Sequence, residues 1–363
     1  MYMDSKRVGI ITTTTPLFSS GLAQNAFFIY EALTNAGNAC DLFVYGPEYK
    51  LSYKDILVKT ITQSADDFIY ENYKTVITVG NGVTKLMYEK FKSYGIKVFG
   101  FVCGNVLPMH MAAFISDKSK SSIVTKSQPV DKLWIIDSFS YMKTYVELLR
   151  GAPAISVPHL WSPILLEDAV INRFKKSIKD ITYSPKHSTK INILILEPNI
   201  DIVKNALIPI MAAEKLHQTY PELINEVYIF NFPEYNSAHT IIDNLTIRPR
   251  TRIFKSQHIG IVLSHFNLMD VMPIFVSHQI LTPWNYFYYE LMYYGFPLVH
   301  NSDLLKSYCY FYPNYDIDLC AAQIKKAFDM HNANYETQQL LNRIYLEGID
   351  PKKTCNYWNH LIK

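Results

Sequence analysis

The apolar positions of the first 160 residues fall into short runs separated by longer segments with helical periodicity. Runs rich in β-branched and aromatic residues predict strands at Arg7–Thr12, 39–45, 75–79, 97–102, 133–136 and 154–157. Helices are predicted at about 22–36 and 83–94, and another ends near residue 149. Strands that alternate with helices indicate a parallel sheet, whose ligands bind beyond the carboxyl ends of the strands. Those ends are the loops 12–24, 80–82 and 104–110.

A second series of the same kind begins at residue 191, where Ile191–Leu196 is the continuous apolar run expected of a strand covered on both faces. Pro158–Pro163 forms a bend, and the lysine-rich stretch 164–190 marks the domain boundary. The sequence predicts a turn at 197–201, a helix at 203–217, strands at 227–230 and 260–263, and closing helices at 319–332 and 334–346. The fold class is therefore α/β, with an N-terminal Rossmann-like domain at 1–165, a linker at 166–190, a C-terminal Rossmann-like domain at 191–345 and a tail at 346–363.

Composition is that of a globular protein with ample core. The 363 residues suffice for two domains of ordinary size, with 49% hydrophobic and 18% charged residues. The five cysteines are scattered without a CxxC pair, which argues against a zinc site or a disulfide framework and indicates a reducing compartment. No signal peptide is recognisable, and no apolar run approaches the ~20 residues of a membrane span. We expect a cytoplasmic protein without a membrane span, located in the host cytoplasm if a phage encodes it.

The segment Thr282–Ser302 contains the most informative pattern. A helix predicted at Tyr286–Tyr294 ends at Gly295, and a short apolar strand and a polar turn follow. Nucleotide-sugar glycosyltransferases built from two Rossmann-like domains carry this arrangement where they hold the donor. In them a carboxylate on the helix reaches the ribose, and N–H groups of the turn reach the diphosphate. An ordinary αβ unit would give the same pattern, so the choice depends on other residues.

Islands of sequence in a fixed order connect the chain with a known family. They are Gly21–Asn25, Asp131–Trp134, Val157–Pro163, Ile195–Ile200 with Val203–Lys204, Ser264–His265, Asn285–Tyr286 and Pro297–Ser302. Over almost its whole length the chain resembles a largely uncharacterised bacterial and phage family of GT-B-like proteins, a family of unknown function related in layout to retaining GT-B glycosyltransferases. The resemblance implies a GT-B fold, in which two Rossmann-like domains face a central cleft and the C-terminal tail packs back toward the first domain. It also implies a hexosyl- or pentosyltransferase that uses a nucleotide sugar, with UDP as the expected nucleotide, and no further cofactor.

One position departs from the better-known retaining enzymes. Their E-x7-E pattern places a glutamate near the donor sugar eight residues before a second glutamate near the ribose. Glu290 fits the second position, but Thr282 occupies the first. The sugar-side carboxylate is therefore missing or replaced from elsewhere, which leaves the sugar and the choice between retention and inversion open.

Glu290 and Lys204 are the candidates with the clearest chemistry. An unpaired carboxylate is costly to bury in an aromatic helix, and a ribose diol would supply two donors to Glu290. Lys204 is expected in the first turn of a helix, where a positive charge is unfavourable unless an anionic ligand is near. Related enzymes place a basic residue there to offset the charge of the leaving diphosphate. The alternatives are a surface-facing helix glutamate and a solvated lysine.

Further candidates lie near the predicted ends of strands. His300, Asn301 and Ser302 can offer N–H groups to the diphosphate, or they can be a simple cap of the next helix. Ser264 and His265 are expected to end a strand near the base or the donor sugar, although a lone histidine is more often a core or capping residue. The resemblance adds four donor-binding positions, which are Glu197, Asn199, Asn285 and Tyr286.

The first domain contributes a second set of candidates. Gly21, Gln24 and Asn25 start its first helix, where a glycine lets a ligand approach the backbone closely and the amides can bind phosphate or sugar hydroxyls. A turn glycine followed by ordinary helix amides is the alternative. His110 is a candidate base, as is Asp137, although a retaining mechanism of this kind needs no enzyme base.

The acceptor is indicated by charge alone. Residues 116–190 hold twelve Lys and Arg against seven Asp and Glu, and Lys118, Lys120 and Lys126 lie in a serine-rich stretch. Arg248–Arg252 is a second basic cluster. Such residues can follow the phosphate backbone of DNA whose hydroxylated base is flipped out, or they can be solvated faces with no such role. The prediction leans slightly to phage DNA, and a cell-surface polysaccharide or a lipid-linked sugar is the rival acceptor.

The sequence thus predicts a metal-independent, nucleotide-sugar-dependent glycosyltransferase. Metal independence is expected because the adjacent pair Asp66–Asp67 lacks the spacing of a metal-binding DxD motif. A catalytically silent nucleotide-binding module is the alternative from another class, and the missing glutamate keeps it open. A nicotinamide dehydrogenase is disfavoured because no GxGxxG follows a strand. No pattern predicts an oligomeric state.

Overall fold

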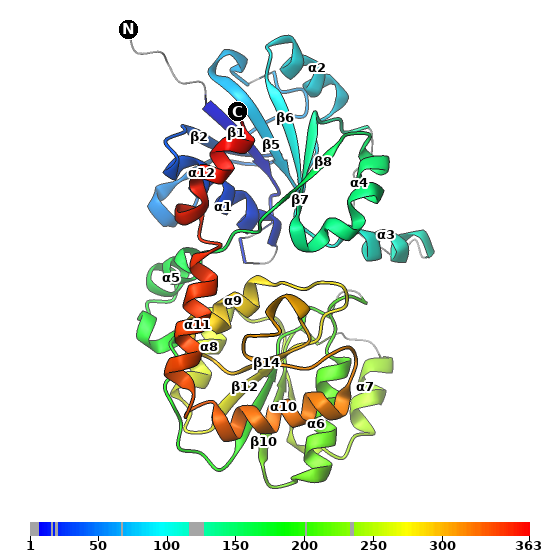
Figure 1. Cartoon of the computed structure of the whole chain (residues 1–363), viewed down its shortest axis with the longest axis vertical. Helices are drawn as coiled ribbons and strands as arrows, with labels where there is room; N and C mark the ends of the chain where they lie inside the picture. The colour runs from blue at the N-terminus through cyan, green and yellow to red at the C-terminus, as the bar shows by residue number, and fades with distance from the viewer. Residues whose placement is uncertain are drawn as a thin grey trace. The chain divides into compact units, whose positions relative to one another are not determined.

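A computed structural model describes residues 7–15, 17–18, 21–66, 68–115, 127–199, 202–232 and 236–363. The chain separates into two units, one of Met1–Ser162 with Glu347–Lys363 and one of Pro163–Leu346. The first unit therefore contains both ends of the chain, and its C-terminal helix is drawn in red beside blue elements in Figure 1. Each unit is built on a largely parallel sheet and is described by itself.

The first unit has a doubly wound arrangement of strands and helices. Its strands are β1 Arg7–Thr12, β2 Cys40–Val44, β3 Tyr49–Lys50, β4 Leu57–Thr60, β5 Tyr73–Val79, β6 Lys97–Val102, β7 Lys132–Ile136 and β8 Ala154–Val157. Its α-helices are α1 Gly21–Asn35, α2 Lys85–Ser93, α3 Val106–Ile115, α4 Lys143–Arg150 and α12 Pro351–Leu361. In the described residues the sheet order is β3-β4-β2-β1-β5-β6-β7-β8, and only β3 and β4 pair antiparallel. The six strands predicted for this part of the chain are confirmed.

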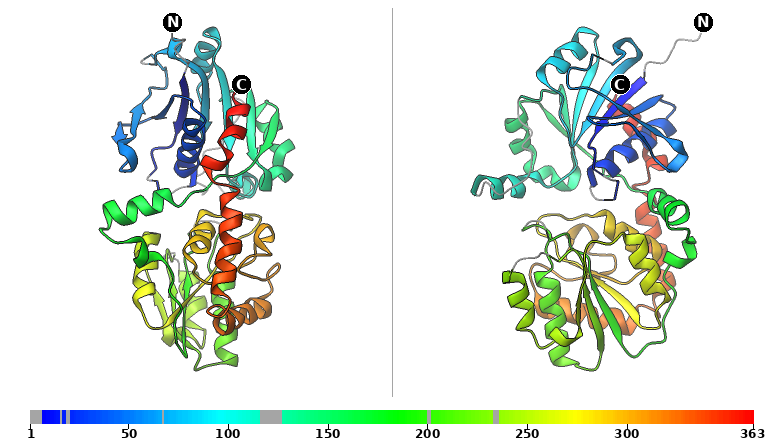
Figure 2. Two further views of the ribbon diagram at one scale, coloured as in Figure 1. Left: turned by 60° about the vertical axis from the view of Figure 1, so that its left-hand side comes forward. Right: turned by 180° about the vertical axis from the view of Figure 1, so that it is seen from behind.

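The C-terminal helix α12 completes the core of the first unit. It packs against α1, and the two helices are seen side by side in Figures 1 and 2. The fully buried Trp358 of α12 lies edge-on to Trp134 of β7, with ring centres 5.6 Å apart, and 5.9 Å from the ring of Phe101 in β6. Aromatic pairs in this geometry stabilise a fold beyond the effect of the apolar area that they bury. The last helix thus adds an aromatic side chain to the core that β6 and β7 form.

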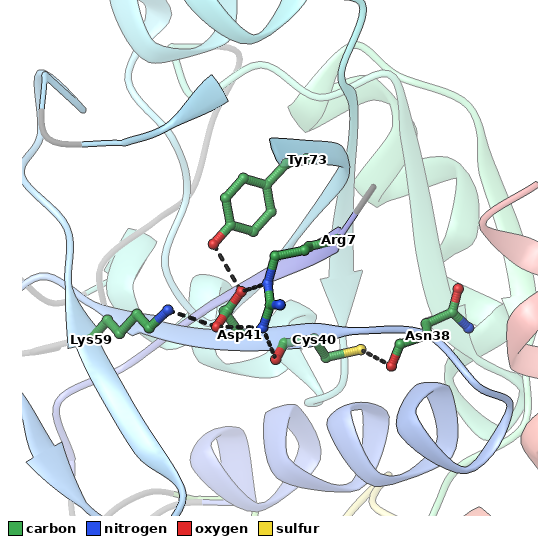
Figure 3. Close-up of polar contacts among 6 residues, drawn as sticks. All are labelled: Arg7, Asn38, Cys40, Asp41, Lys59 and Tyr73. Atoms are coloured by element: carbon green, nitrogen blue, oxygen red, sulfur yellow. Dashed lines mark hydrogen bonds and ion pairs between the residues drawn. The ribbon is translucent and has the colours of Figure 1, made fainter. Parts of the chain in front are cut away.

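A buried carboxylate stabilises the amino end of the first sheet. Asp41 of β2 accepts hydrogen bonds from Arg7 at 3.0 Å, from Lys59 at 2.8 Å and from the hydroxyl of Tyr73 at 2.8 Å (Figure 3). Burial raises the pKa of this carboxyl, but the three donors outweigh burial and the pKa is lowered. Arg7 and Tyr73 are the first residues of β1 and β5, so this cluster lies at the edge opposite to the expected ligand edge.

The second unit repeats the plan with a fully parallel sheet. Its strands are β9 Ile191–Ile195, β10 Ile224–Ile229, β11 Thr251–Ile253, β12 Met272–Val276, β13 Leu298–His300 and β14 Tyr310–Phe311. Its α-helices are α5 Ile164–Asp168, α6 Leu207–Thr219, α7 Asn236–Asp243, α8 Ile259–Leu268, α9 Tyr286–Tyr294, α10 Ile317–Met330 and α11 Tyr335–Glu347. The order in the described residues is β11-β10-β9-β12-β13-β14. Helices α6 and α10 pack together over one apolar core with β9 at its centre.

Helix α9 begins and ends where the sequence predicts. Asn285 caps it by accepting from the N–H of Phe287 at 3.2 Å, and Gly295 ends it in the left-handed conformation, with φ of 81°. A Cβ atom at Gly295 would come within 2.8 Å of the Tyr335 hydroxyl, so glycine is needed for space as well as for conformation. This helix and β13 form the αβ unit predicted for the segment 282–302.

Two predictions for the second unit are wrong. The strand predicted at 260–263 is part of helix α8, because a short apolar run alone does not separate a strand from a buried helix. The strand next in sequence, β12, was missed, since Pro273 lies inside it. Helix α6 begins at Leu207 instead of 203, which places Pro209 in the first turn, where its missing N–H is harmless.

In the described part of the chain, no helix combines the length and the apolar character that crossing a membrane requires.

Replacement of Trp358 by alanine should weaken the first unit by about 3–5 kcal/mol, the usual effect of removing a buried aromatic side chain. Hydrogen–deuterium exchange should show faster exchange in α1, β6 and β7. The control is its neighbour Tyr357→Ala, because Tyr357 is 43% exposed and should leave exchange unchanged. Equal effects of the two substitutions would contradict the packing described for α12.

Candidate functional site

Polar side chains gather at the carboxyl edge of the second sheet. Glu197 follows β9, residues Ser277, His278 and Gln279 follow β12, and Asn301 follows β13. These three strands are neighbours in the sheet, so their ends meet at one edge. We call these five residues the edge cluster. All of them except Asn301 are buried, which is unusual for polar groups in a loop region.

Glu197 is the ionisable centre of the edge cluster. The hydroxyl of Ser277 donates to one carboxyl oxygen, and the Nε2 group of Gln279 donates to the other at 3.4 Å. Burial raises the pKa of Glu197 to about 7, although Ser277, the charge of Lys204 and other donors act in the opposite direction. The Ser277 hydroxyl also lies 2.8 Å from the hydroxyl of Tyr288 on α9. Burial thus makes the neutral form of the Glu197 carboxyl more accessible than it is for an exposed glutamate.

Asn301 holds the backbone of the edge cluster in place. Its Oδ1 accepts from the N–H of Gln279, and its Nδ2 donates to the carbonyl of Gln279, both at 2.9 Å. On the other side, Gln279 forms an antiparallel bridge with Lys204, and the N–H of Ile280 donates to Val203 at 2.8 Å. The loop after β12 is thus fixed from two directions.

Lys204 is not in a helix, contrary to the sequence prediction. It lies in the extended segment that pairs with Gln279, three residues before α6. Its charge is therefore not at a helix N-terminus, where it would be unfavourable. Lys204 instead places a positive charge close enough to Glu197 to lower the pKa of that carboxyl.

Glu290 lies in the middle of α9 and is only 6% exposed. Burial raises the pKa of its carboxyl to about 8. Within the described residues, no hydrogen bond to this carboxyl occurs. Tyr286 and Tyr294 lie one turn before and one turn after it on the same helix face. A buried acid without a partner is costly, so Glu290 is a residue whose presence stability alone does not explain.

His300, the last residue of β13, and Ser302 just beyond it serve the fold. His300 accepts from the N–H of Ser302 at 3.1 Å through Nδ1, and its Nε2 lies 3.0 Å from the carbonyl of Tyr308. Burial lowers the pKa of His300 to about 4, so the imidazole is neutral. Ser302 caps a 3-10 helix of three residues, η7 Asp303–Leu305. The N–H group of Ser302 is therefore already used, and only a single short turn follows it.

Asn199 also has a structural part. It adopts a left-handed conformation with φ of 55°, its Nδ2 donates to the carbonyl of Glu197 at 2.8 Å, and its Oδ1 accepts from the N–H of Ala206 at 2.8 Å. The turn between β9 and α6 is built around this side chain.

Ser264 and His265 do not lie at the carboxyl edge. They belong to the second half of α8, which leads into the amino end of β12. Ser264 is fully buried, and the His265 ring packs edge-on against Phe266 at 5.0 Å. The prediction that they end a strand fails together with the strand itself.

In the first unit, Gly21, Gln24 and Asn25 lie together at the start of α1, as predicted. Asn25 is buried, its Nδ2 donates to the carbonyl of Gly21 at 2.7 Å, and its Oδ1 has no partner among the described residues. The end of β5 lies beside this turn, since a Cβ atom at Gly80 would come within 2.7 Å of Leu22. The carboxyl ends of β1 and β5 and the start of α1 therefore form one edge.

His110 lies on α3, and its Nδ1 is 2.7 Å from the hydroxyl of Tyr145. Burial lowers the pKa of His110 and so favours its neutral form. Lys118, Lys120 and Lys126 lie outside the described residues.

The sequence does contain a pair of acidic residues with DxD spacing, Asp316 and Asp318, so the spacing of Asp66–Asp67 does not by itself support metal independence. Asp316 caps α10 by accepting from the N–H of Leu319, and Asp318 pairs with Lys215 at 2.8 Å. Both carboxylates thus have partners within the fold.

Sequence reasoning missed most of the edge cluster. Ser277, His278 and Gln279 were not considered because β12 was not recognised, and Tyr288 and Tyr312, which hold them, resemble any other buried tyrosine. The signal that was available is the polar triplet Ser277–Gln279 directly after the run Met272–Val276.

Solved structures show the same architecture over the whole chain. A glycosyltransferase from Rickettsia africae ESF-5 matches with a TM-score of 0.61 and 11% identity, covering 99% of this chain and 98% of that chain. An alpha-glucosyltransferase in complex with UDP and a 13-mer DNA containing an HMU base matches with a TM-score of 0.61 and 12% identity, covering 99% of both chains. The trehalose-6-phosphate synthase OtsA matches with a TM-score of 0.58 and 12% identity, covering 98% of both chains. The predicted fold, two Rossmann-like domains of the GT-B kind, is confirmed.

No curated protein matches the chain in sequence. The family described as "Protein of unknown function (DUF2827)" matches residues 8–361, which is nearly the whole chain. That match confirms the resemblance drawn from the sequence islands. The protein is a member of the DUF2827 family with a GT-B fold.

Proposed function

We propose that this protein is a glycosyltransferase that moves a sugar from a nucleotide sugar, with UDP as the expected nucleotide, to an acceptor hydroxyl. The observation that carries the proposal is Glu290 on α9, whose side chain is only 6% exposed and whose carboxyl makes no hydrogen bond among the described residues. A ribose diol beside Glu290 would supply the hydrogen bonds that the protein itself does not. The fold supports the same reaction class, since the similar GT-B structures include glycosyltransferases.

Each unit, taken by itself, offers further groups with chemistry that suits this reaction. Lys204 supplies positive charge near the edge cluster and would offset the charge that develops on the departing diphosphate. The start of α1, with Gly21, Gln24 and Asn25, would bind phosphate or sugar hydroxyls. His110 would serve as the base if the reaction needs one, because burial lowers its pKa and so favours the neutral imidazole that can accept a proton.

A second candidate function is nucleotide binding without transfer. It is favoured by Thr282, which occupies the sugar-side position of the E-x7-E pattern and whose hydroxyl donates to the carbonyl of Ile280 at 3.3 Å. A silent binding module would hold the nucleotide sugar intact. A transferase would hydrolyse it slowly when no acceptor is present.

The two candidate acceptor classes are DNA and a polysaccharide or lipid-linked sugar. The contacts of the basic cluster Arg248–Arg252 weaken the case for DNA. In the basic cluster, Arg248 pairs with Asp243 and Arg252 pairs with Glu226, each at 2.7 Å, while Arg250 donates to the carbonyl of Ile224. Ile224 begins β10, so these arginines lie at the amino edge of the sheet. DNA retains support from the similarity to the alpha-glucosyltransferase bound to a DNA 13-mer.

Helix α3 supports the rival class, a lipid-linked sugar. None of its ten residues is buried or charged as Asp, Glu, Lys or Arg, and Phe114 is 94% exposed at its end. An apolar helix of this kind suits an apolar carrier better than it suits a phosphate backbone.

Thermal-shift measurements with UDP, GDP, ADP, CMP and their common sugar conjugates should identify the donor. One nucleotide should raise the melting temperature strongly, and Glu290→Ala should abolish that shift. Glu214→Ala is the matched control, because this buried glutamate is already bound by Thr246 and by the N–H of Ile247. The control should lower stability and leave the shift intact. The absence of a shift with every nucleotide would remove the basis of the proposal.

Glu290 should also make stability depend on pH. The unfolded carboxyl ionises near its usual pKa of 4.5 and the folded one near 8, so between these values the folded chain retains a proton that the unfolded chain has lost. Stability therefore falls as the pH rises through this window. Glu290→Gln cannot ionise and should melt at the wild-type temperature near pH 4.5 and several degrees higher at pH 8. A variant less stable than wild type at both pH values would contradict the assignment.

Transfer from a radiolabelled donor should separate the acceptor classes. DNA containing 5-hydroxymethyl pyrimidines, unmodified DNA and a lipid-linked sugar are offered in parallel, and the label is followed into each. We expect label in the hydroxymethylated DNA and none in unmodified DNA. Label in the lipid fraction alone would replace the DNA assignment. If the donor is hydrolysed in none of the reactions and no label is transferred, the silent binding module is favoured.

A further inference from the structure

Two buried acceptor atoms at the end of β12 have no hydrogen-bond donor among the described residues. They are Nε2 of His278 and Oε1 of Gln279, in side chains that are 2% and 4% exposed. Buried polar atoms in folded proteins almost always have partners, and an exception needs an explanation. Other buried atoms without a partner occur elsewhere among the described residues, but these two are adjacent in sequence and lie in the edge cluster with Glu197. The inference drawn from them rests on the function proposed above.

The hydrogen bonds of Tyr312 decide which nitrogen of His278 carries the proton. The Tyr312 hydroxyl lies 3.0 Å from Nδ1 of His278 and 3.2 Å from the carbonyl oxygen of Ser277. The carbonyl can only accept, so the single proton of Tyr312 satisfies both contacts only when Nδ1 donates to the hydroxyl oxygen. Burial lowers the pKa of His278 to about 4, so the ring holds one proton. Nε2 is then a bare lone pair.

The two acceptors are held rigidly. Asn301 binds both backbone groups of Gln279, the Gln279 side chain donates to Glu197, and Tyr312 orients the His278 ring. Groups held in this way lose little further freedom when they bind a ligand. This rigidity argues for a recognition site, since a merely misplaced side chain would have no such support.

The chemistry of the site selects its ligand. Lone pairs without adjacent donors repel phosphate and carboxylate and attract O–H or N–H groups. Thr282, where related enzymes have the sugar-side glutamate, already uses its hydroxyl on the carbonyl of Ile280. His278 and Gln279 lie in the same loop, four and three residues before Thr282.

We propose that His278 and Gln279 bind the hydroxyl groups of the donor sugar and take the place of the missing sugar-side carboxylate. Nε2 of His278 accepts from one sugar hydroxyl, and Oε1 of Gln279 accepts from a second. A donor sugar with free hydroxyls is therefore required, and a sugar deoxygenated or alkylated at these positions is rejected.

In this structure Nε2 is shielded from water, so the sugar must displace a neighbouring side chain. Tyr315 is the side chain that the sugar would displace, because its ring centre lies 5.0 Å from that of His278 while the residue is 56% exposed. An exposed tyrosine can rotate away without leaving a cavity behind.

The test combines fluorinated ligands with two substitutions of His278. UDP, UDP-glucose and the 2-, 3-, 4- and 6-deoxyfluoro forms of UDP-glucose are titrated calorimetrically, because fluorine cannot donate a hydrogen bond. In His278→Asn the amide replaces Nδ1 and leaves nothing at Nε2, whereas in His278→Gln the amide reaches the Nε2 position. One deoxyfluoro compound should bind wild type about fivefold more weakly than UDP-glucose, the usual effect of one hydrogen bond. That penalty should vanish in His278→Asn and return in His278→Gln.

Gln279→Met gives an independent reading, because it keeps the length of the side chain and removes the acceptor. It should cancel the penalty of a different deoxyfluoro compound. His331→Asn is the matched control, since both ring nitrogens of this buried histidine have partners, the hydroxyl of Tyr310 and the carbonyl of Gly295. It should lower stability and leave every fluorine penalty unchanged.

The outcomes separate this inference from the function on which it rests. Tight binding of UDP with the same fluorine penalties in wild type, His278→Asn and Gln279→Met would overturn the inference and leave the donor site intact. Binding of UDP-glucose no tighter than UDP would overturn it as well. No binding of UDP or UDP-glucose would refute both the UDP donor site and the inference.

Discussion

One side chain fixes the edge on which the second unit depends. Asn301 accepts from the N–H of Gln279 and donates to its carbonyl, both at 2.9 Å, and so joins the loops after β12 and β13. Because the same stretch of backbone is bridged to Lys204 on its other side, the polar residues after three neighbouring strands are held in one arrangement. A site that must distinguish similar ligands needs this rigidity, and a loop held only by its ends would not provide it.

The edge so formed is not optimised for stability. Glu197 and Glu290 are buried acids with pKa values raised to about 7 and about 8, and His278 and Gln279 keep acceptor atoms without donors. In the first sheet, by contrast, the buried Asp41 is fully paired through its contacts with Arg7, Lys59 and Tyr73 (Figure 3). Buried groups that lower stability in this way are typical of binding sites, and they mark the carboxyl edge of the second sheet as the candidate.

The sequence predicted the parts of this account that local physics controls. The first series of strands was correct because each is a β-rich apolar run with a clear stop, and α9 was correct because Asn285 and Gly295 define its ends. The strand β12 was missed because Pro273 contradicts a central strand, and that error hid Ser277, His278 and Gln279. Lys204 was assigned to a helix because its pairing with Gln279 joins residues 75 positions apart, which no local pattern can reveal. Glu290 was found because a carboxylate within a run of aromatic residues is conspicuous in the sequence itself.

The central claim is that a nucleotide sugar binds at the carboxyl edge of the second sheet. A crystal structure of the protein grown with UDP tests this claim most directly. The account predicts density for the nucleotide at the ends of β12 and β13, with a ribose hydroxyl within hydrogen-bond distance of the Glu290 carboxyl. A nucleotide bound elsewhere, with Glu290 still unpartnered, would contradict it.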